Sequence, residues 1–317
     1  MPISTYPGLA LTGARVSDLV TNPAAQFEAQ VALHERYHTP VVLSAMDLSA
    51  EAEAFGCTLH LADNEVPSVT GRLVENMKQA QDLAIPQPGD RRTGVYLETV
   101  RRLRQIRGPL VLGGCIGPFS LAARLAGVSE ALELTMTEPD LMSTLIEKSA
   151  AFLTSYALAF REAGADGLIM AEPAAGLLSP RAMSAFSSAY VRQIGEAVSD
   201  GRFALILHNC GAKLLHLPTI LETGLSTFHF GAPMDIVSAL NQVSPEVVLC
   251  GNLDPTAVFV QMPPAEVEAR VTGLLAATAR KNFVLSSGCD LPPGASLTNL
   301  DAFYRAFHRT CPDPAGG

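Results

Sequence analysis

One pattern repeats along most of the sequence: a short apolar run ends in polar or glycine residues, and a longer helical pattern follows. This alternation is typical of βα units whose strands form a parallel sheet. The runs with strand character are residues 40–45, 58–61, 110–113, 167–171, 203–207, 227–230, 247–250 and 283–286. Eight such runs favour a closed barrel over an open sheet, so we predict an α/β fold of the (β/α)8 TIM barrel type.

Helix start and stop signals support this division of the chain. Pro139 opens a helical pattern that ends at Gly164, a natural C-terminal stop. Residues 1–39 are interpreted as an N-terminal helical extension that leads into the barrel, with a helix over residues 24–37. No repeat, low-complexity segment or linker interrupts the pattern, and we therefore predict that residues 1–317 form a single barrel domain.

The composition limits the partners and the compartment. A net charge of −9 argues against nucleic acid as a partner, because phosphate binding needs a basic surface. The sequence shows no secretory signal and no apolar run of about 18 residues that could span a membrane, so we expect a cytoplasmic protein. Six irregularly spaced cysteines fit metal binding or packing better than a disulfide framework. An apolar surface without tryptophan is compatible with a homodimer.

Potential metal ligands stand at the ends of two predicted strands. His208 and Cys210 follow one apolar run, and Cys289 follows another. In an extended segment His208 and Cys210 project on the same side, because strand side chains alternate. One imidazole and two thiolates suit Zn²⁺, and three protein ligands leave the fourth tetrahedral position for water or substrate. The structural alternative is two cysteines that pack as small hydrophobes and a histidine that is hydrogen bonded without a metal.

Two carboxylates follow other strands. The active site of a TIM barrel is built from the carboxyl ends of the strands, so Asp47 and Glu172 are expected at the barrel mouth. Each is a candidate catalytic residue that would orient a zinc ligand or an acceptor. The alternative for both is a salt bridge to a neighbouring loop.

Four further residues are candidates for binding the substrate or cofactor. Gly114 and Cys115 precede a helix, whose free backbone N–H groups could hold an anionic tail such as a sulfonate or carboxylate. Asn252 and Asp254 are expected to line the mouth, although Asp254 is also placed to cap the next helix.

Several motifs together carry a family resemblance. They lie at residues 47–56, 64–69, 117–122, 171–173, 208–211, 251–255 and 286–299. This set resembles the uroporphyrinogen decarboxylase superfamily, and more narrowly its corrinoid-dependent branch, of the methylcobamide:coenzyme M methyltransferase type. The resemblance covers nearly the whole chain, and the His-x-Cys motif with a distant Cys is its most specific part.

The resemblance implies a (β/α)8 barrel with a catalytic Zn²⁺ on His208, Cys210 and Cys289. It also implies a methyl-corrinoid (cobalamin) donor, carried by a partner corrinoid protein, and a small-molecule methyl acceptor such as coenzyme M or tetrahydrofolate. The hypothesis for the reaction is in-line attack of an acceptor thiolate on the cobalt-bound methyl group, with the corrinoid leaving as Co(I).

One departure from this branch concerns the fourth zinc ligand. The coenzyme M branch can fill the fourth zinc position with a glutamate after the sixth strand, but Gly231 stands there, so His229 or water would take its place.

The alternative function is a metal-free lyase of the uroporphyrinogen decarboxylase type. That type has an Arg-rich N-terminal segment, whereas Arg15 is the only arginine among the first 35 residues of this chain. A non-catalytic corrinoid-binding or scaffold protein is the third interpretation.

Overall fold

The structure, a computed structural model that describes residues 1–311, is built around a curled parallel sheet of seven strands. The strand order is β1-β4-β5-β6-β7-β8-β9, and a separate two-stranded sheet pairs β2 with β3. The strands are β1 (Val41–Leu43), β2 (Thr58–Ala62), β3 (Glu65–Thr70), β4 (Leu110–Ile116), β5 (Gly167–Ala171), β6 (Ala204–Asn209), β7 (Thr227–Phe230), β8 (Val248–Leu253) and β9 (Phe283–Ser287). The predicted α/β class with parallel strands is confirmed.

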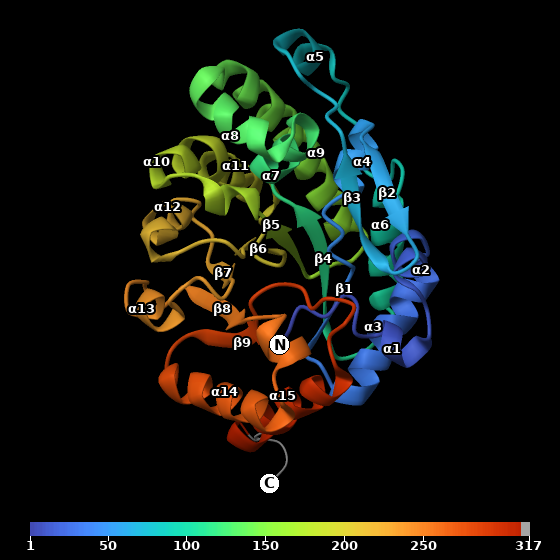
Figure 1. Cartoon of the computed structure of the whole chain (residues 1–317), viewed down its shortest axis with the longest axis vertical. Helices are drawn as coiled ribbons and strands as arrows, with labels where there is room; N and C mark the ends of the chain where they lie inside the picture. Colours follow the sequence, from blue (N-terminus) through green and yellow to red (C-terminus); the bar gives the residue numbers. More distant parts are fainter. Residues whose placement is uncertain (312–317) are drawn as a thin grey trace.

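Helices surround the curled sheet (Figure 1). They are α1 (Leu9–Thr12), α2 (Val16–Thr21), α3 (Pro23–Tyr37), α4 (Ala50–Phe55), α5 (Met77–Asp82), α6 (Thr93–Leu103), α7 (Pro118–Ala126), α8 (Val128–Thr137), α9 (Pro139–Glu162), α10 (Pro180–Met183), α11 (Ala189–Val198), α12 (Leu217–Leu221), α13 (Ile236–Leu240), α14 (Pro264–Ala277) and α15 (Leu297–Thr310). Among residues 1–311, none of these helices has the length and apolar character to cross a membrane.

The longest helix, α9, shows how the helices pack on the sheet. Pro139 opens the helix and Arg161 stands in its last turn, where a cation suits the helix dipole. Tyr156 and Phe160 lie fully buried on its inner face, and each such ring contributes roughly 1.5–3 kcal/mol by burial. A Cβ atom at Gly113 of β4 would lie 2.6 Å from Cδ1 of Phe160, so only glycine lets this ring reach the strand.

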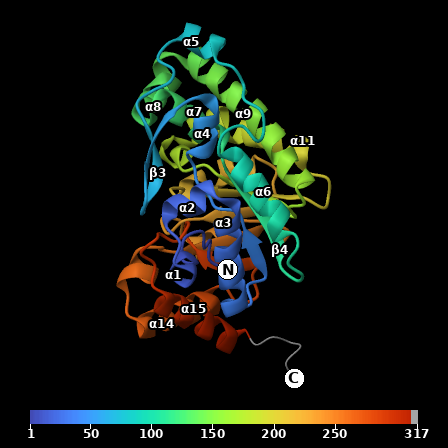
Figure 2. The same ribbon diagram turned by 90° about the vertical axis from the view of Figure 1, so that its right-hand side faces the viewer.

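The predicted eighth barrel strand, residues 58–61, is wrong. This segment forms β2, which pairs antiparallel with β3 in a hairpin outside the main sheet. Figures 1 and 2 both show the hairpin at the edge of the molecule. Leu61 and Val66 are about half exposed, at 46% and 45%, so the hairpin lacks the two covered faces that a parallel barrel strand requires. In the sequence, the apolar residues of this segment look like those of a buried strand.

The first residues of the chain lie between the two edge strands, β1 and β9. The Ile3 amide donates to Ser287 Oγ at the end of β9, and the Leu291 amide donates back to the Ile3 carbonyl oxygen, both at 2.9 Å. The side chain of Ile3 packs with Leu43 of β1 inside the curled sheet. One step along, the Thr5 amide donates to Asp290. The N-terminal segment therefore bridges the sheet edges that no eighth strand joins.

The space enclosed by the sheet is apolar below the carboxyl ends of its strands. Ile3, Leu43, Leu112, Ile169 and Ala171 form a buried cluster there. Ile206 of β6 packs against the same cluster from its partly buried position. Two residues further along β6 comes His208, which therefore points to the same interior above this apolar floor. His208 thus lies at the end of the sheet where the strands finish.

Candidate metal centre

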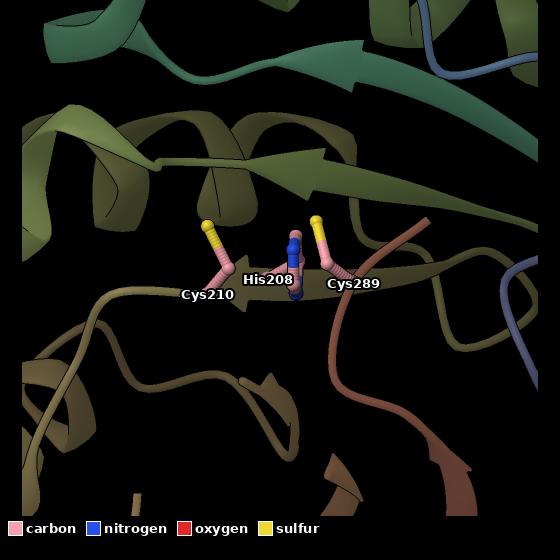
Figure 3. A group of neighbouring side chains, drawn as sticks. All are labelled: His208, Cys210 and Cys289. Atoms are coloured by element: carbon pink, nitrogen blue, oxygen red, sulfur yellow. The ribbon is translucent and has the colours of Figure 1, made fainter. Parts of the chain in front are cut away.

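The structure brings together the three predicted metal ligands. One ligand atom from each of His208, Cys210 and Cys289 lies within 4.8 Å of the others. Figure 3 shows the imidazole between the two thiols, with Cys210 just after β6 and Cys289 just after β9. His208 is buried, whereas both cysteines are partly exposed. A ligand can therefore approach the sulfur atoms from the open end of the sheet.

The local backbone explains how two distant segments converge. Leu205 and Leu207 of β6 pack outward against the helices, and His208 alternates with them to face the interior. Cys289 follows Gly288, where an added Cβ atom would come within 2.9 Å of the Ala232 amide nitrogen. The absence of a side chain at Gly288 lets the loop after β9 press against the loop after β7. This close approach places Cys289 beside the end of β6.

One nitrogen atom of the group lacks the partner that a bound metal would provide. His208 Nε2 is buried and has no hydrogen-bond partner within residues 1–311. A buried nitrogen without a partner costs about 1–3 kcal/mol, because it has lost its hydrogen bonds to water. A nitrogen lone pair beside two sulfur atoms is a ligand set that Zn²⁺ prefers. The residues present therefore fit a zinc ion.

The two thiols affect each other's protonation. A hydrogen bond from Cys289, helped by His208, lowers the pKa of Cys210 to about 4. The same hydrogen bond, followed by burial, raises the pKa of Cys289 far above that of an ordinary thiol. The hydrogen bond thus favours the thiolate form of Cys210 over that of Cys289, and thiolate is the form that coordinates metals.

His229, which the sequence offered as a fourth ligand, lies behind His208. Its Nδ1 is 2.8 Å from Nδ1 of His208, and its Nε2 is 2.9 Å from Ser286 Oγ. Burial lowers the pKa of His229 well below its usual range, which makes this ring neutral. Both of its nitrogens are occupied by these two neighbours, and His229 has none left for a metal.

Gly231 has a steric reason to be glycine. A Cβ atom at this position would lie 2.1 Å from the carbonyl oxygen of Cys210 and 2.8 Å from its Cα. Any longer side chain, including a glutamate, would displace the backbone of a metal-ligand candidate. With neither Gly231 nor His229 available as a ligand, a metal held by the three candidate ligands would have its fourth position open to water or to a substrate.

Glu172 lies at the end of β5, but its carboxylate points to the start of α7. It accepts hydrogen bonds from the backbone amides of Phe119 and Ser120, both at 2.9 Å, and from Ser120 Oγ at 2.6 Å. Gly117 makes room for it, since a Cβ atom there would meet the Glu172 side chain at 2.3 Å. This carboxylate thus caps the start of α7, and the catalytic role of Glu172 stays a prediction.

Asp47 forms a buried ion pair with Arg92 just before α6. Its carboxylate also accepts hydrogen bonds from Tyr96 Oη at 2.8 Å and from Ser49 Oγ at 2.6 Å. Arg92 pairs in addition with Glu53 at 2.7 Å. Of the two roles predicted for Asp47, the salt bridge to a neighbouring segment is confirmed, and its oxygens are fully engaged in that network.

The predicted anion site at Gly114 and Cys115 is already filled. The helix that follows is α7, and the amides at its start are bound by Glu172. The Gly114 amide donates to Ser44 Oγ at 3.1 Å within the sheet. Cys115 is buried, and burial together with Glu51 and Glu172 raises the pKa of its thiol well above the usual value. Neither residue is free to bind a substrate tail.

Asn252 and Asp254 belong to the wall beside the site. The Asn252 side-chain amide donates to the carbonyl oxygens of Gly231 and Met234, at 3.2 and 2.7 Å. Asp254 accepts from the backbone amides of Thr256 and Ala257, which confirms the predicted cap. Both residues also line a hollow of about 810 Å³ that extends toward α14.

A buried carboxyl group at the end of β4, that of Glu51, makes the stability depend on pH. Oε1 of Glu51 accepts from the Ile116 amide at 3.0 Å, while its Oε2 has no partner in the described chain. Burial raises the pKa of Glu51 from 4.5 to about 8, so between these pH values the folded state holds a proton that the unfolded state has released. Stability must therefore fall as pH rises, by up to about 1.4 kcal/mol per pH unit for this group.

We expect Glu51→Gln to flatten the decrease in unfolding free energy between pH 5 and pH 8, as measured by urea unfolding at each pH. Glutamine does not titrate, so the contribution of this position to the slope disappears. Glu98→Gln, at a partly exposed carboxylate on α6, is the matched control and should leave the slope unchanged. Identical slopes for wild type and Glu51→Gln would contradict the assignment.

Several residues near the site escaped the sequence analysis. Arg92 and Tyr96 stand in no recognisable motif, and Ser286 opens the motif at residues 286–299 without a predicted role; their contacts form only in the folded chain. The contact between His208 and His229 had a detectable signal, because both lie in neighbouring parallel strands and occupy paired positions in the register.

The chain matches one protein family over most of its length. The family is described as uroporphyrinogen decarboxylase (URO-D), and the match covers residues 8–310. A similar protein from Methanosarcina mazei, "Methylcobamide:CoM methyltransferase MtbA", is 30% identical over 288 residues, which cover 87% of this chain and 84% of the relative. "Uroporphyrinogen decarboxylase" from Pseudomonas paraeruginosa is 27% identical over 318 residues, covering 95% of this chain and 88% of that protein.

A solved structure shares the fold. It is described as "methyltransferase from Methanosarcina mazei", with a TM-score of 0.87, 23% sequence identity, and coverage of 97% of this chain and 93% of that one. At this identity the likeness concerns the arrangement of helices and strands.

Proposed function

The chain belongs to the uroporphyrinogen decarboxylase (URO-D) family, and from this premise we propose that it is a zinc-dependent methyltransferase. It would move a methyl group from a methyl-corrinoid to the thiol of a small acceptor of the coenzyme M type. The observation that carries the proposal is the group of His208, Cys210 and Cys289 at the open end of the sheet. The similarity to a methylcobamide:CoM methyltransferase over 87% of the chain supports it.

Zinc would be held by His208 Nε2 and by the sulfur atoms of Cys210 and Cys289. When bound, it supplies Lewis acidity that keeps an acceptor thiol deprotonated at neutral pH. The chain's own residues orient the reaction. His229 holds the His208 ring through its Nδ1 atom, and the apolar cluster inside the sheet keeps water away from the inner side of the ring. The acceptor therefore enters from the side of the two cysteines.

The transfer itself exchanges one bond for another. The acceptor sulfur forms a bond to the methyl carbon as the cobalt–carbon bond breaks, and the electron pair of that bond stays with cobalt, which leaves as Co(I). The two thiols lie at the carboxyl ends of the strands, so the corrinoid would approach from that side. We propose that a partner corrinoid protein presents it there.

The main alternative, a metal-free decarboxylase, finds less support at the mouth. A substrate with several carboxylates requires free cationic side chains. Arg92 is the only buried arginine within residues 1–311, and Asp47 and Glu53 already neutralise it. Nothing in a decarboxylase would require a buried imidazole nitrogen aimed at two thiols.

The proposal is tested by elemental analysis of the purified protein together with a spectral assay of methylcobalamin. We expect one zinc per chain and a thiol-dependent loss of the methyl-Co(III) absorbance, because the site offers three ligands and one open position. Coenzyme M, a second small thiol and tetrahydrofolate would be compared as acceptors. A protein that contains no zinc after metal is supplied under reducing conditions would favour the decarboxylase or scaffold alternative.

We also propose that the protein is located in the cytoplasm. All six cysteines are free thiols, which suits a reducing cytoplasm. A homodimer stays a prediction from the composition, and its test is the molecular mass in solution.

A further inference from the structure

We propose that His229 and Ser286 are positioning residues that hold the proton of His208 on Nδ1 and leave its Nε2 lone pair for the metal. The inference rests on the metal site of the proposed function. It concerns how this chain presents its one nitrogen ligand, and it assigns a role to two buried polar residues that contact no substrate.

The geometry is a continuous chain of three side chains from neighbouring parts of the sheet. Nδ1 of His208 lies 2.8 Å from Nδ1 of His229, and Nε2 of His229 lies 2.9 Å from Ser286 Oγ. The two rings meet edge to face, with centroids 4.7 Å apart. All three side chains are at least 96% buried, so water cannot substitute for any of them.

Hydrogen-bond chemistry then permits one proton arrangement in the metal-bound protein. A nitrogen that binds a metal must offer a lone pair, so Nε2 of His208 carries no proton and Nδ1 carries it. That Nδ1–H donates to Nδ1 of His229, which must be the acceptor. His229 therefore carries its own proton on Nε2 and donates it to Ser286 Oγ.

This relay replaces the carboxylate or carbonyl that usually receives the second N–H of a metal-bound histidine. Unlike a carboxylate or a carbonyl group, an imidazole is both a donor and an acceptor, so the direction of its hydrogen bonds can reverse. If Ser286 could not accept, His229 could place its proton on Nδ1 and donate toward His208. His208 would then carry its proton on Nε2 and would be unable to bind a metal.

The test compares zinc dissociation constants, measured by competition with a chromophoric chelator, for three variants that are first shown to be folded. We expect His229→Leu to weaken zinc binding by about 10–100-fold, the range typical of lost outer partners. His229→Gln should stay close to wild type, because its amide oxygen can accept from His208 and its N–H can donate to Ser286. Ser286→Ala should fall between these two variants.

Ser149→Ala is the matched control, since Ser149 is a fully buried serine that donates to a helix carbonyl in α9, away from the site. It should bind zinc like wild type. Equal losses in His229→Gln and His229→Leu would show that only packing matters, and wild-type affinity in His229→Leu would also overturn the proposal. A second readout is the histidine ¹⁵N spectrum of the zinc-loaded protein, in which His208 must carry its proton on Nδ1.

The two proposals fail in distinguishable ways. If wild type binds zinc and the variants follow the expected order, but no methyl transfer occurs, the relay stands and the methyltransferase proposal falls. If methyl transfer occurs with zinc and His229→Leu binds the metal normally, the relay falls and the methyltransferase stands. The zinc measurements do not depend on the identity of the acceptor.

Discussion

Replacing either Cys210 or Cys289 by alanine is expected to abolish stoichiometric zinc binding and to lower methyl transfer by more than about 100-fold. The loss should exceed the 10–100-fold effect of removing an outer partner of a metal ligand, because a direct ligand is lost. Two of the three ligand atoms within 4.8 Å are these sulfur atoms, and the remaining pair would form an incomplete site. Zinc content by elemental analysis and the methylcobalamin assay measure both effects.

Cys311→Ala provides the control for this experiment. Cys311 is exposed at the end of the described chain, so its removal should change neither zinc content nor activity. Thermal unfolding of each variant separates a lost ligand from a lost fold. Full activity in either Cys210→Ala or Cys289→Ala would remove zinc from the proposed reaction.

The largest loss of stability is expected for Arg92→Met. The Asp47 carboxylate has no exposed surface, and the Arg92 side chain is only 8% exposed, so the pair is shielded from water. Breaking a buried pair by removing one partner leaves an uncompensated charge, at a cost of about 3–5 kcal/mol in unfolding free energy. Urea unfolding at neutral pH measures the difference directly.

Arg101→Met is the matched control, because Arg101 pairs with Glu98 on the surface of α6. Exposed pairs contribute about 0–1 kcal/mol, so this variant should unfold almost like wild type. The double variant Asp47→Asn with Arg92→Met should recover part of the loss, since it no longer buries an unpaired charge. A similar small loss for Arg92→Met and Arg101→Met would show that Asp47 is solvated.

The grouping of the three candidate metal ligands could be predicted from the sequence because part of its signal is local. His208 and Cys210 lie within three residues, and strand periodicity alone determines that they share a face. The third ligand, Cys289, was found because parallel strands deliver their ends to one edge. The structure places all three together.

The features that could not be predicted from the sequence depend on partners that are distant along the chain. Nothing near Asp47 indicates that its charge is matched by Arg92, 45 residues later. Glu172 follows a strand as a catalytic carboxylate would, and only the packing of α7 reveals that it caps a helix. The hairpin at residues 58–61 has the composition of a strand, and its exposure is decided by what packs nearby.

The contacts between the first residues and the end of β9 affect how the chain folds. The bond between Ile3 and Ser287 joins residues 284 positions apart, and that between Thr5 and Asp290 spans 285. Such contacts cannot form until β9 has been synthesised, and closing so long a loop costs conformational entropy that only later contacts repay. Because Asp290 adjoins Cys289, this candidate metal ligand reaches its place only when the N-terminal segment meets the segment that follows β9.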